Sequence, residues 1–81
     1  IGTLNQSLVH PREVFYPAIK DKAAAIIIAH NHPSGQLFPS RADKQVTTRL
    51  KDAGKLIGID IIDHIILTSD GFYSFQDEGL L

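Results

Sequence analysis

Two long apolar runs stand out along the chain. Residues 23–29 are apolar without interruption, and residues 59–68 are largely apolar apart from Asp60, Asp63 and His64. Both runs have the length of a strand and are apolar at odd and even positions, which is typical of strands buried on both faces. We therefore predict that residues 23–29 form a central strand of a sheet, and that residues 59–68 form another strand.

Residues 41–57 follow a helical period instead, because their apolar positions are three or four residues apart. The positions expected to face the core are Val46, Leu50, Ala53 and Ile57. Ser40 suits the N-cap, and Asp43 stands at the third helical position of a pattern that resembles a capping box. Gly58 is a natural carboxy-terminal stop.

The first part of the chain predicts a strand over residues 2–9 and a helix that opens at His10-Pro11. Proline suits the first helical position, where its missing N–H is not needed. Pro17 would remove a hydrogen bond in mid-helix, so we expect a kink or a split there. For His10 we expect a loop or capping role, and we expect the helix to end near Lys22.

The end of the chain predicts a hairpin turn over residues 69–71 and a short strand over residues 72–75. The order of elements then predicts an α/β domain with a mixed sheet flanked by helices. Residues 33–39 form a turn-rich loop, in which Leu37 and Phe38 either cover a site or anchor the loop to the core.

The candidate chemistry lies where the first apolar run meets this loop. His30 and His32 continue the two-residue period of the strand and point to the same side. With Asp43 they make three ligands of the type that zinc prefers, which leaves a fourth position open as in catalytic sites. The alternative is a pair of exposed histidines, with Ser40 and Asp43 serving only as a helix cap.

The spacing His30-x-His32, seven residues, then Ser40-x-x-Asp43 resembles the metal-binding core of JAMM (MPN-type) metallohydrolases. HNHPSG followed by PSRAD resembles the RadC branch in particular, as do GTLN, HPREVF, IDIIDHIIL and FYSF elsewhere in the chain. This resemblance implies a cytidine-deaminase-like fold and zinc bound by His30, His32 and Asp43. It also implies that Ser40 assists catalysis at the bound water or the developing oxyanion.

JAMM enzymes also use a glutamate as general base, on a strand well before the two histidines. Glu13 is the only glutamate that precedes His30 here, and we expect it to have a structural or capping role. We therefore expect the base to lie upstream of Ile1. The 81 residues would then be one RadC-type domain over residues 1–81, as a fragment that lacks its N-terminal strand or strands. The exposed sheet edge left behind favours a homodimer.

Asp63 and His64 are also candidate site residues, either as part of a catalytic triad or as outer partners of the metal ligands. Adjacent residues on a strand face opposite ways, so both can reach one site only if the strand bulges. A buried, hydrogen-bonded role for His64 is the simpler expectation, and the resemblance assigns it no firm role.

Composition narrows the classes of protein. The chain has no cysteine, which excludes disulfides and cysteine-ligated zinc and fits a cytoplasmic protein. The net charge is −1, with 8 Lys+Arg against 9 Asp+Glu, which is not typical of an independent nucleic-acid binder. No apolar run approaches the ~20 residues of a membrane span.

Three functions remain open. The first is a zinc hydrolase that cleaves an amide, in a peptide or isopeptide substrate. The second is a binding module without chemistry of its own that works in DNA repair, for which the family's traditional name is the support. The third is a metal-dependent nuclease, which ranks last because a single His2Asp site lacks the second metal common in nucleases.

Overall fold

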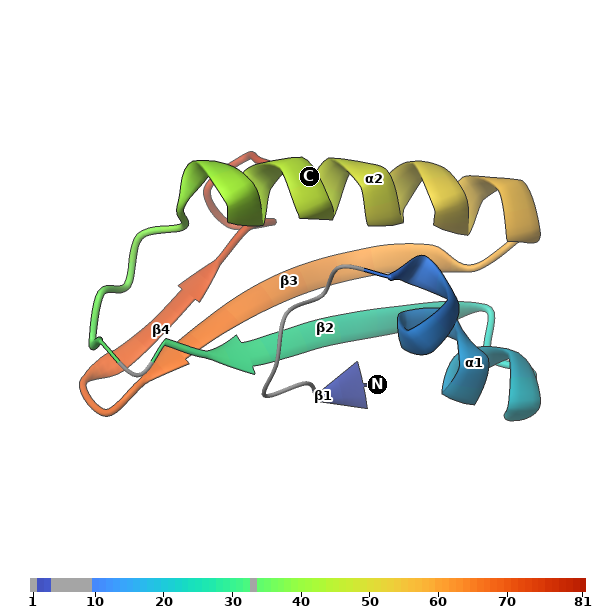
Figure 1. The fold of residues 1–81 in the computed structure, drawn as a ribbon, viewed down its shortest axis with the longest axis horizontal. Helices are drawn as coiled ribbons and strands as arrows, with labels where there is room; N and C mark the ends of the chain where they lie inside the picture. The colour runs from blue at the N-terminus through green and yellow to red at the C-terminus, as the bar shows by residue number, and fades with distance from the viewer. Residues whose placement is uncertain (1, 4–9, 33) are drawn as a thin grey trace.

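The computed structural model describes residues 2–3, 10–32 and 34–81 (Figure 1). The elements are β1 (Gly2–Thr3), α1 (Pro11–Lys20), β2 (Ala25–Asn31), α2 (Arg41–Ile57), β3 (Asp60–Thr68) and β4 (Gly71–Ser74). The strand predicted over residues 2–9 is seen only at its start, because residues 4–9 lie outside the described residues. The predicted α/β class with a mixed sheet is confirmed.

The sheet has the order β1-β2-β3-β4. β2 lies between β1 and β3 and is parallel to both, whereas β4 pairs antiparallel to β3 as the second strand of a hairpin. Successive right-handed crossovers in one direction along a sheet place their helices on the same face. Figure 1 shows this arrangement, with α1 beside α2 over the strands. One helical layer therefore covers one face of the sheet.

Burial along β2 alternates accordingly. Ile26, Ile28 and His30 are buried under the helices, whereas Ala25, Ile27 and Ala29 on the other face are only half-buried. The expectation that this strand is covered on both faces is not met by the described residues. An apolar run shows that both faces of a strand can be buried. It does not show whether a second layer of structure covers the face opposite the helices.

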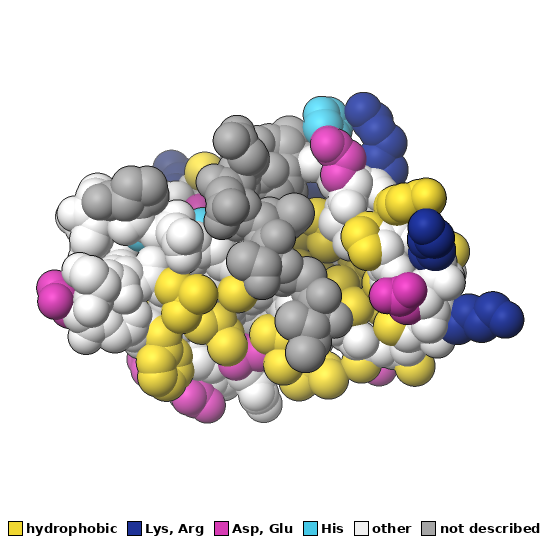
Figure 2. Space-filling view, turned by 90° about the horizontal axis from the view of Figure 1, so that it is seen from below, with side chains coloured by type: hydrophobic (Ala, Val, Ile, Leu, Met, Phe, Trp, Pro, Cys, Tyr) yellow, Lys and Arg dark blue, Asp and Glu magenta, His cyan; other side chains and the backbone are white. Residues whose placement is uncertain are grey.

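The face of the sheet opposite the helices remains apolar near the hairpin. Leu67 of β3 and Phe72 of β4 are register partners, and their exposed fractions are 38% and 61%. Figure 2 shows hydrophobic side chains gathered at the same end of the molecule, where the hairpin lies in Figure 1.

The core lies between the helices and the sheet. Its buried members are Val14, Phe15, Ala18, Ile26, Ile28, Leu50, Ile59 and Ile61. One prediction for α2 is wrong, because Ile57 is 48% exposed. Thr47 and Gly54, which the apolar pattern does not include, are buried against the core. Gly54 is needed there, because a Cβ on it would lie 2.3 Å from the carbonyl oxygen of Ile59.

Helix α1 begins as predicted and continues through Pro17. Of the predicted kink or split at this residue, the split is wrong and the kink stays a prediction. Pro17 and Glu13 are both exposed, so water can solvate the Glu13 carbonyl that lacks its usual donor. His10 occupies the N-cap position without a side-chain capping bond. Neither helix of the described residues is both long and apolar enough to cross a membrane.

The loop before α2 rests on the β3–β4 hairpin. The Phe38 ring meets the Tyr73 ring edge to face at 6.0 Å, and the Leu37 side chain lies beside Gly71. Phe38 remains 77% exposed, so it anchors the loop to the hairpin and not to the core.

Candidate metal centre

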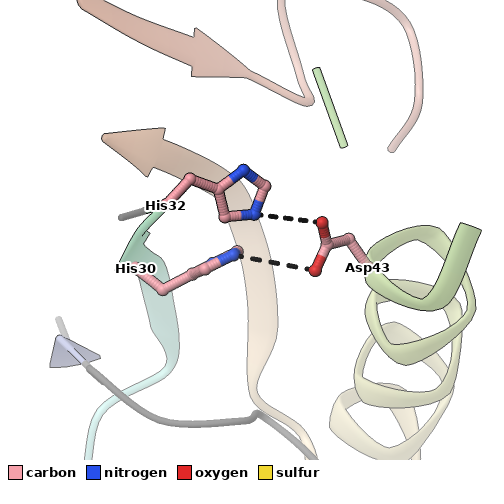
Figure 3. A group of neighbouring side chains, drawn as sticks. All are labelled: His30, His32 and Asp43. Atoms are coloured by element: carbon pink, nitrogen blue, oxygen red, sulfur yellow. Dashed lines mark ion pairs between the residues drawn. The ribbon is translucent and has the colours of Figure 1, made fainter. Parts of the chain in front are cut away.

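The structure brings His30, His32 and Asp43 together (Figure 3). His30 is the second-last residue of β2. The backbone N–H of His32 donates to the carbonyl of Leu67 at 3.0 Å. This bond extends the pairing with β3 by one residue, so both imidazoles keep the same side. Asp43 enters from the first turn of α2. One nitrogen or oxygen of each residue lies within 4.8 Å of the others.

Both histidines aim Nε2 at the same carboxylate, as Figure 3 shows. His32 Nε2 lies 3.1 Å from Asp43 Oδ2, and His30 Nε2 lies 3.7 Å from Asp43 Oδ1. In a tetrahedral zinc site with bonds of 2.0–2.2 Å, neighbouring ligand atoms are roughly 3.3–3.6 Å apart. The two observed separations end on different oxygens of Asp43 and lie on either side of this range, so the spacing of the three side chains is compatible with a metal ion.

The orientation of His32 supports the same view. Its Nδ1 lies 2.8 Å from the carbonyl oxygen of Gln36, which can only accept a hydrogen bond. Nδ1 therefore carries a proton, and in the tautomer with no proton on Nε2 a lone pair faces Asp43 Oδ2. Two acceptors facing each other at 3.1 Å repel unless a cation or a proton lies between them. The donor set is thus compatible with a metal ion.

Asp43 serves the helix cap and the cluster at once. Its Oδ2 accepts from the backbone N–H of Ser40 at 2.8 Å, and its own N–H donates to Ser40 Oγ at 3.0 Å. This is the predicted capping box, which is confirmed. The two roles do not exclude each other, because a carboxylate has lone pairs for several partners. Ser40 Oγ accepts in the cap, which leaves its hydroxyl hydrogen free to donate.

The charges of the cluster favour deprotonated ligands. Burial lowers the pKa of His30 and outweighs the attraction of Asp43 for a proton on the ring. For Asp43, burial alone would raise the pKa, but hydrogen bonding by Ser40 and the nearby His30 and His32 bring it below its ordinary value. Metal ligation requires a neutral imidazole and an ionised carboxylate, which these shifts favour.

His64 joins the cluster from β3. Its Nε2 lies 2.8 Å from His30 Nδ1, its Nδ1 lies 2.6 Å from Thr47 Oγ1, and its ring stacks on Phe75 at 4.4 Å. The side chain is fully buried, and burial lowers the pKa of His64 to about 4, with the charge of His30 as the next cause. The predicted buried, hydrogen-bonded role is confirmed.

Thr47 was missed by reasoning from the sequence. It lies between Val46 and Leu50, and a polar residue within the core-facing stripe of a helix is the signal that could have found it. Asp63 points away from the cluster, because it is adjacent to His64 on β3 and adjacent residues of a strand face opposite sides of the sheet. It accepts hydrogen bonds from the backbone N–H of His64 and Gln76 and from Ser74 Oγ. Asp63 therefore connects β3 to the end of β4 and to the turn that follows it.

The remaining candidates lie elsewhere. His10 and Glu13 are exposed at the start of α1 and are not part of the cluster. Among the residues that the structure describes, no glutamate joins the group of His30, His32 and Asp43. A hollow of about 370 Å³ opens beside His32, lined also by Asn31, Gly35, Leu67, Thr68 and Ser69.

Comparisons with known proteins indicate the family of this chain. A family model described as "RadC-like JAB domain" matches residues 1–80. The chain is 58% identical over 81 residues to a UPF0758 protein of Pelodictyon phaeoclathratiforme, of which it covers 36%. It is 55% identical over 80 residues (99% of the chain) to a UPF0758 protein of Trichlorobacter lovleyi, of which it covers 35%.

A third relative, a UPF0758 protein of Rubrobacter xylanophilus, is 53% identical over the whole chain, which again covers 35% of that protein. The chain thus spans about a third of the length of these curated relatives. The two helices, the mixed sheet and the match over nearly all residues lead to one conclusion. The chain belongs to the RadC-like JAB domain family, which is related to the JAMM/MPN domains.

Proposed function

We propose that this chain carries the metal site of a zinc-dependent hydrolase that cleaves an amide bond in a peptide or isopeptide substrate. One observation carries the proposal. Two imidazole Nε2 atoms and a carboxylate converge at separations of 3.1 and 3.7 Å, and His32 also lines an open hollow. Zinc is preferred over other divalent ions because two nitrogens and one oxygen suit it best.

The residues divide the work. His30, His32 and Asp43 would hold the ion from two elements that are fixed by the sheet ladder and by the helix cap. Polarisation of the scissile carbonyl and acidification of water are the chemistry that zinc supplies in such sites. Ser40 would donate its free hydroxyl hydrogen to the oxyanion that develops. The hollow beside His32 would hold the chain of the substrate.

A proton acceptor for the attacking water is still required. Since the described cluster contains no glutamate, we propose that another part of the whole protein supplies it. The chain covers about a third of its relatives, so activity has to be tested on the full-length protein.

The test is a panel of peptide and isopeptide substrates, incubated with the full-length protein with zinc and after treatment with a chelator. We expect cleavage that the chelator abolishes and that His32→Ala lowers by more than about 100-fold, as expected when chemistry depends on one group. His10→Ala is the matched control, because this histidine is exposed and outside the cluster. Cleavage that survives in His32→Ala, or no cleavage of any substrate, would contradict the proposal.

The lack of a glutamate in the described cluster favours one other candidate, a binding module in DNA repair without chemistry of its own. The net charge of −1 weighs against it, because DNA binding rests mainly on contacts to phosphates. DNA binding that weakens with salt and persists in His32→Ala would favour this module over the hydrolase.

A further inference from the structure

We propose that Thr47 and His64 fix the tautomer of His30, so that its Nε2 stays unprotonated toward Asp43. This inference rests on the metal site proposed above and assigns two positioning residues to it. Neither residue belongs to the group of three candidate ligands. They act on it through the ring of His30, by a chain of hydrogen bonds that runs from α2 through β3 to β2.

The chain of hydrogen bonds starts at a group that can only accept. Thr47 Oγ1 lies 2.7 Å from the backbone carbonyl oxygen of Asp43. A carbonyl has no hydrogen to give, so the single hydroxyl hydrogen of Thr47 is committed to it. Thr47 Oγ1 can then only accept from His64 Nδ1, which lies 2.6 Å away. His64 therefore carries its proton on Nδ1.

The same reasoning passes through the second ring. In the neutral ring, a proton on Nδ1 leaves a lone pair on Nε2. The ring is fully buried and has Thr47 and His30 as its hydrogen-bond partners. That lone pair accepts from His30 Nδ1 at 2.8 Å. Neutral His30 thus has its proton on Nδ1 and a bare Nε2, which Figure 3 shows aimed at Asp43. Metal-binding histidines ordinarily place their other N–H on a carboxylate, a carbonyl or water, and here another imidazole takes this place.

Burial protects this order of protons. The exposed fractions of Thr47, His64 and His30 are 2%, 0% and 8%, and Phe75 covers one face of the His64 ring. Water therefore has little access to offer the rings other partners. Among the described residues no buried side-chain nitrogen or oxygen lacks a hydrogen-bond partner, so reversing one proton would leave a partner unmatched.

Removing the Thr47 hydroxyl should move the protons of His64 and His30 from Nδ1 to Nε2. In Thr47→Val the side chain keeps its shape, but His64 Nδ1–H loses its acceptor. His64 then gains by moving its proton to Nε2 and donating to His30 Nδ1. His30 would have to carry its own proton on Nε2, at the position that faces Asp43 Oδ1. Thr47→Ser keeps the hydroxyl and is the matched control.

The experiment is ¹⁵N–¹H NMR of the full-length protein, labelled only in histidine and free of metal, which distinguishes the two tautomers of each ring. We expect Nδ1–H at both His30 and His64 in the parent and in Thr47→Ser, and Nε2–H at both in Thr47→Val. Zinc affinity, measured on the same three proteins, should fall about 10–100-fold in Thr47→Val alone, as when outer partners of a metal ligand are lost.

Two results would overturn the inference: Nε2–H at His30 in the parent, or an unchanged tautomer in folded Thr47→Val. A purely structural Thr47 would lower stability without moving these signals. The expected tautomers in a parent that binds no zinc would contradict the proposed hydrolase and leave the hydrogen-bonded chain in place.

Discussion

The two ends of α2 pack on the same sheet by different chemistry. At its first turns the helix contributes Asp43 and Thr47, and their neighbours are His30 of β2 and His64 of β3. At its last turns it contributes Leu50 and Gly54, which pack in the apolar core. The change from polar to apolar packing takes place between Thr47 and Leu50, within one turn of the helix.

This difference shows how a small domain supports a demanding site. At the apolar end Gly54 accepts a hydrogen bond from the N–H of Ile59 at 2.9 Å and allows the backbones to touch. The apolar end stabilises the fold. The polar end can therefore keep imidazole nitrogens and a carboxylate close together, although their lone pairs repel. A site on rigid elements keeps its geometry better than a site on loops. Changes at the apolar end should therefore affect stability, and changes at the polar end should affect metal binding.

The largest expected effect is from Leu50→Ala, at a side chain that is fully buried. Removing it should lower the free energy of unfolding by about 2–5 kcal/mol, because a cavity remains in the core. Urea denaturation measures this loss. Leu56→Ala on the same helix is the control, since Leu56 is 88% exposed and should change stability by less than about 0.5 kcal/mol. Equal losses in the two variants would show that this end is not the stabilising core.

Asp43→Asn should act on the metal instead. The amide oxygen can still accept from the Ser40 N–H, so the metal-free stability should change by less than about 1 kcal/mol. Zinc affinity should fall by more than about 100-fold, beyond the range for outer partners, because the charged ligand is lost. Competition with a chromophoric chelator measures it. Asp52→Asn, at an exposed position of α2, should leave zinc affinity unchanged. An unchanged affinity in Asp43→Asn would remove Asp43 from the site.

Gly54→Ala tests the close approach at the apolar end. The new Cβ would meet the Ile59 carbonyl at 2.3 Å, at a cost near the ~3 kcal/mol upper end for overpacking. Better helix propensity offsets about 1 kcal/mol, so we expect a net loss of about 2 kcal/mol in thermal unfolding. Gly58→Ala separates the effect of steric overlap from the effect of backbone conformation. A Cβ at Gly58 would meet no other atom, but the residue has a φ of 78°. The substitution should cost about 1–2 kcal/mol through the left-handed backbone alone. A Gly54→Ala protein as stable as its parent would rule out the close contact.

Ser40→Ala has the smallest expected effect on stability. It removes the acceptor for the Asp43 N–H and should cost about 1 kcal/mol, as other N-cap losses do. Ser69→Ala, at an exposed turn, is the control and should stay within about 0.5 kcal/mol. No difference between the two in thermal unfolding would mean that the cap contributes nothing to α2.

The helix α2 could be predicted to the residue because its signals are local. Ser40 and Asp43 close the capping box, and Gly58 takes the left-handed conformation that ends the helix. The preceding strand, β2, begins and ends two residues later than the apolar run predicts: the run covers residues 23–29 and the strand covers Ala25–Asn31. The N–H of Ala23 is taken by the carbonyl of Ala18, and pairing with β3 continues past His30. An apolar run alone does not reveal where such long-range pairing starts.

The three candidate ligands could be predicted because strand parity and the cap are local as well. The partners of His30 could not be predicted in the same way. His64 reaches it only because the register between β2 and β3 shifts at Ile26/Ile27, which leaves Ile62 without a partner in β2. The shift depends on how two distant segments pair. A pattern of residue types does not encode such a bulge, so the ring-to-ring contact had to come from the structure.

The most direct test of the central claim is the metal content per folded chain after reconstitution with zinc, measured by elemental analysis. The comparison is between the parent, His32→Ala and His10→Ala, with circular dichroism to confirm folding. The account predicts about one zinc per chain in the parent and in His10→Ala, and none in His32→Ala, since a site of three protein ligands loses one of them. No zinc in the reconstituted parent, or equal zinc in a folded His32→Ala protein, would contradict it.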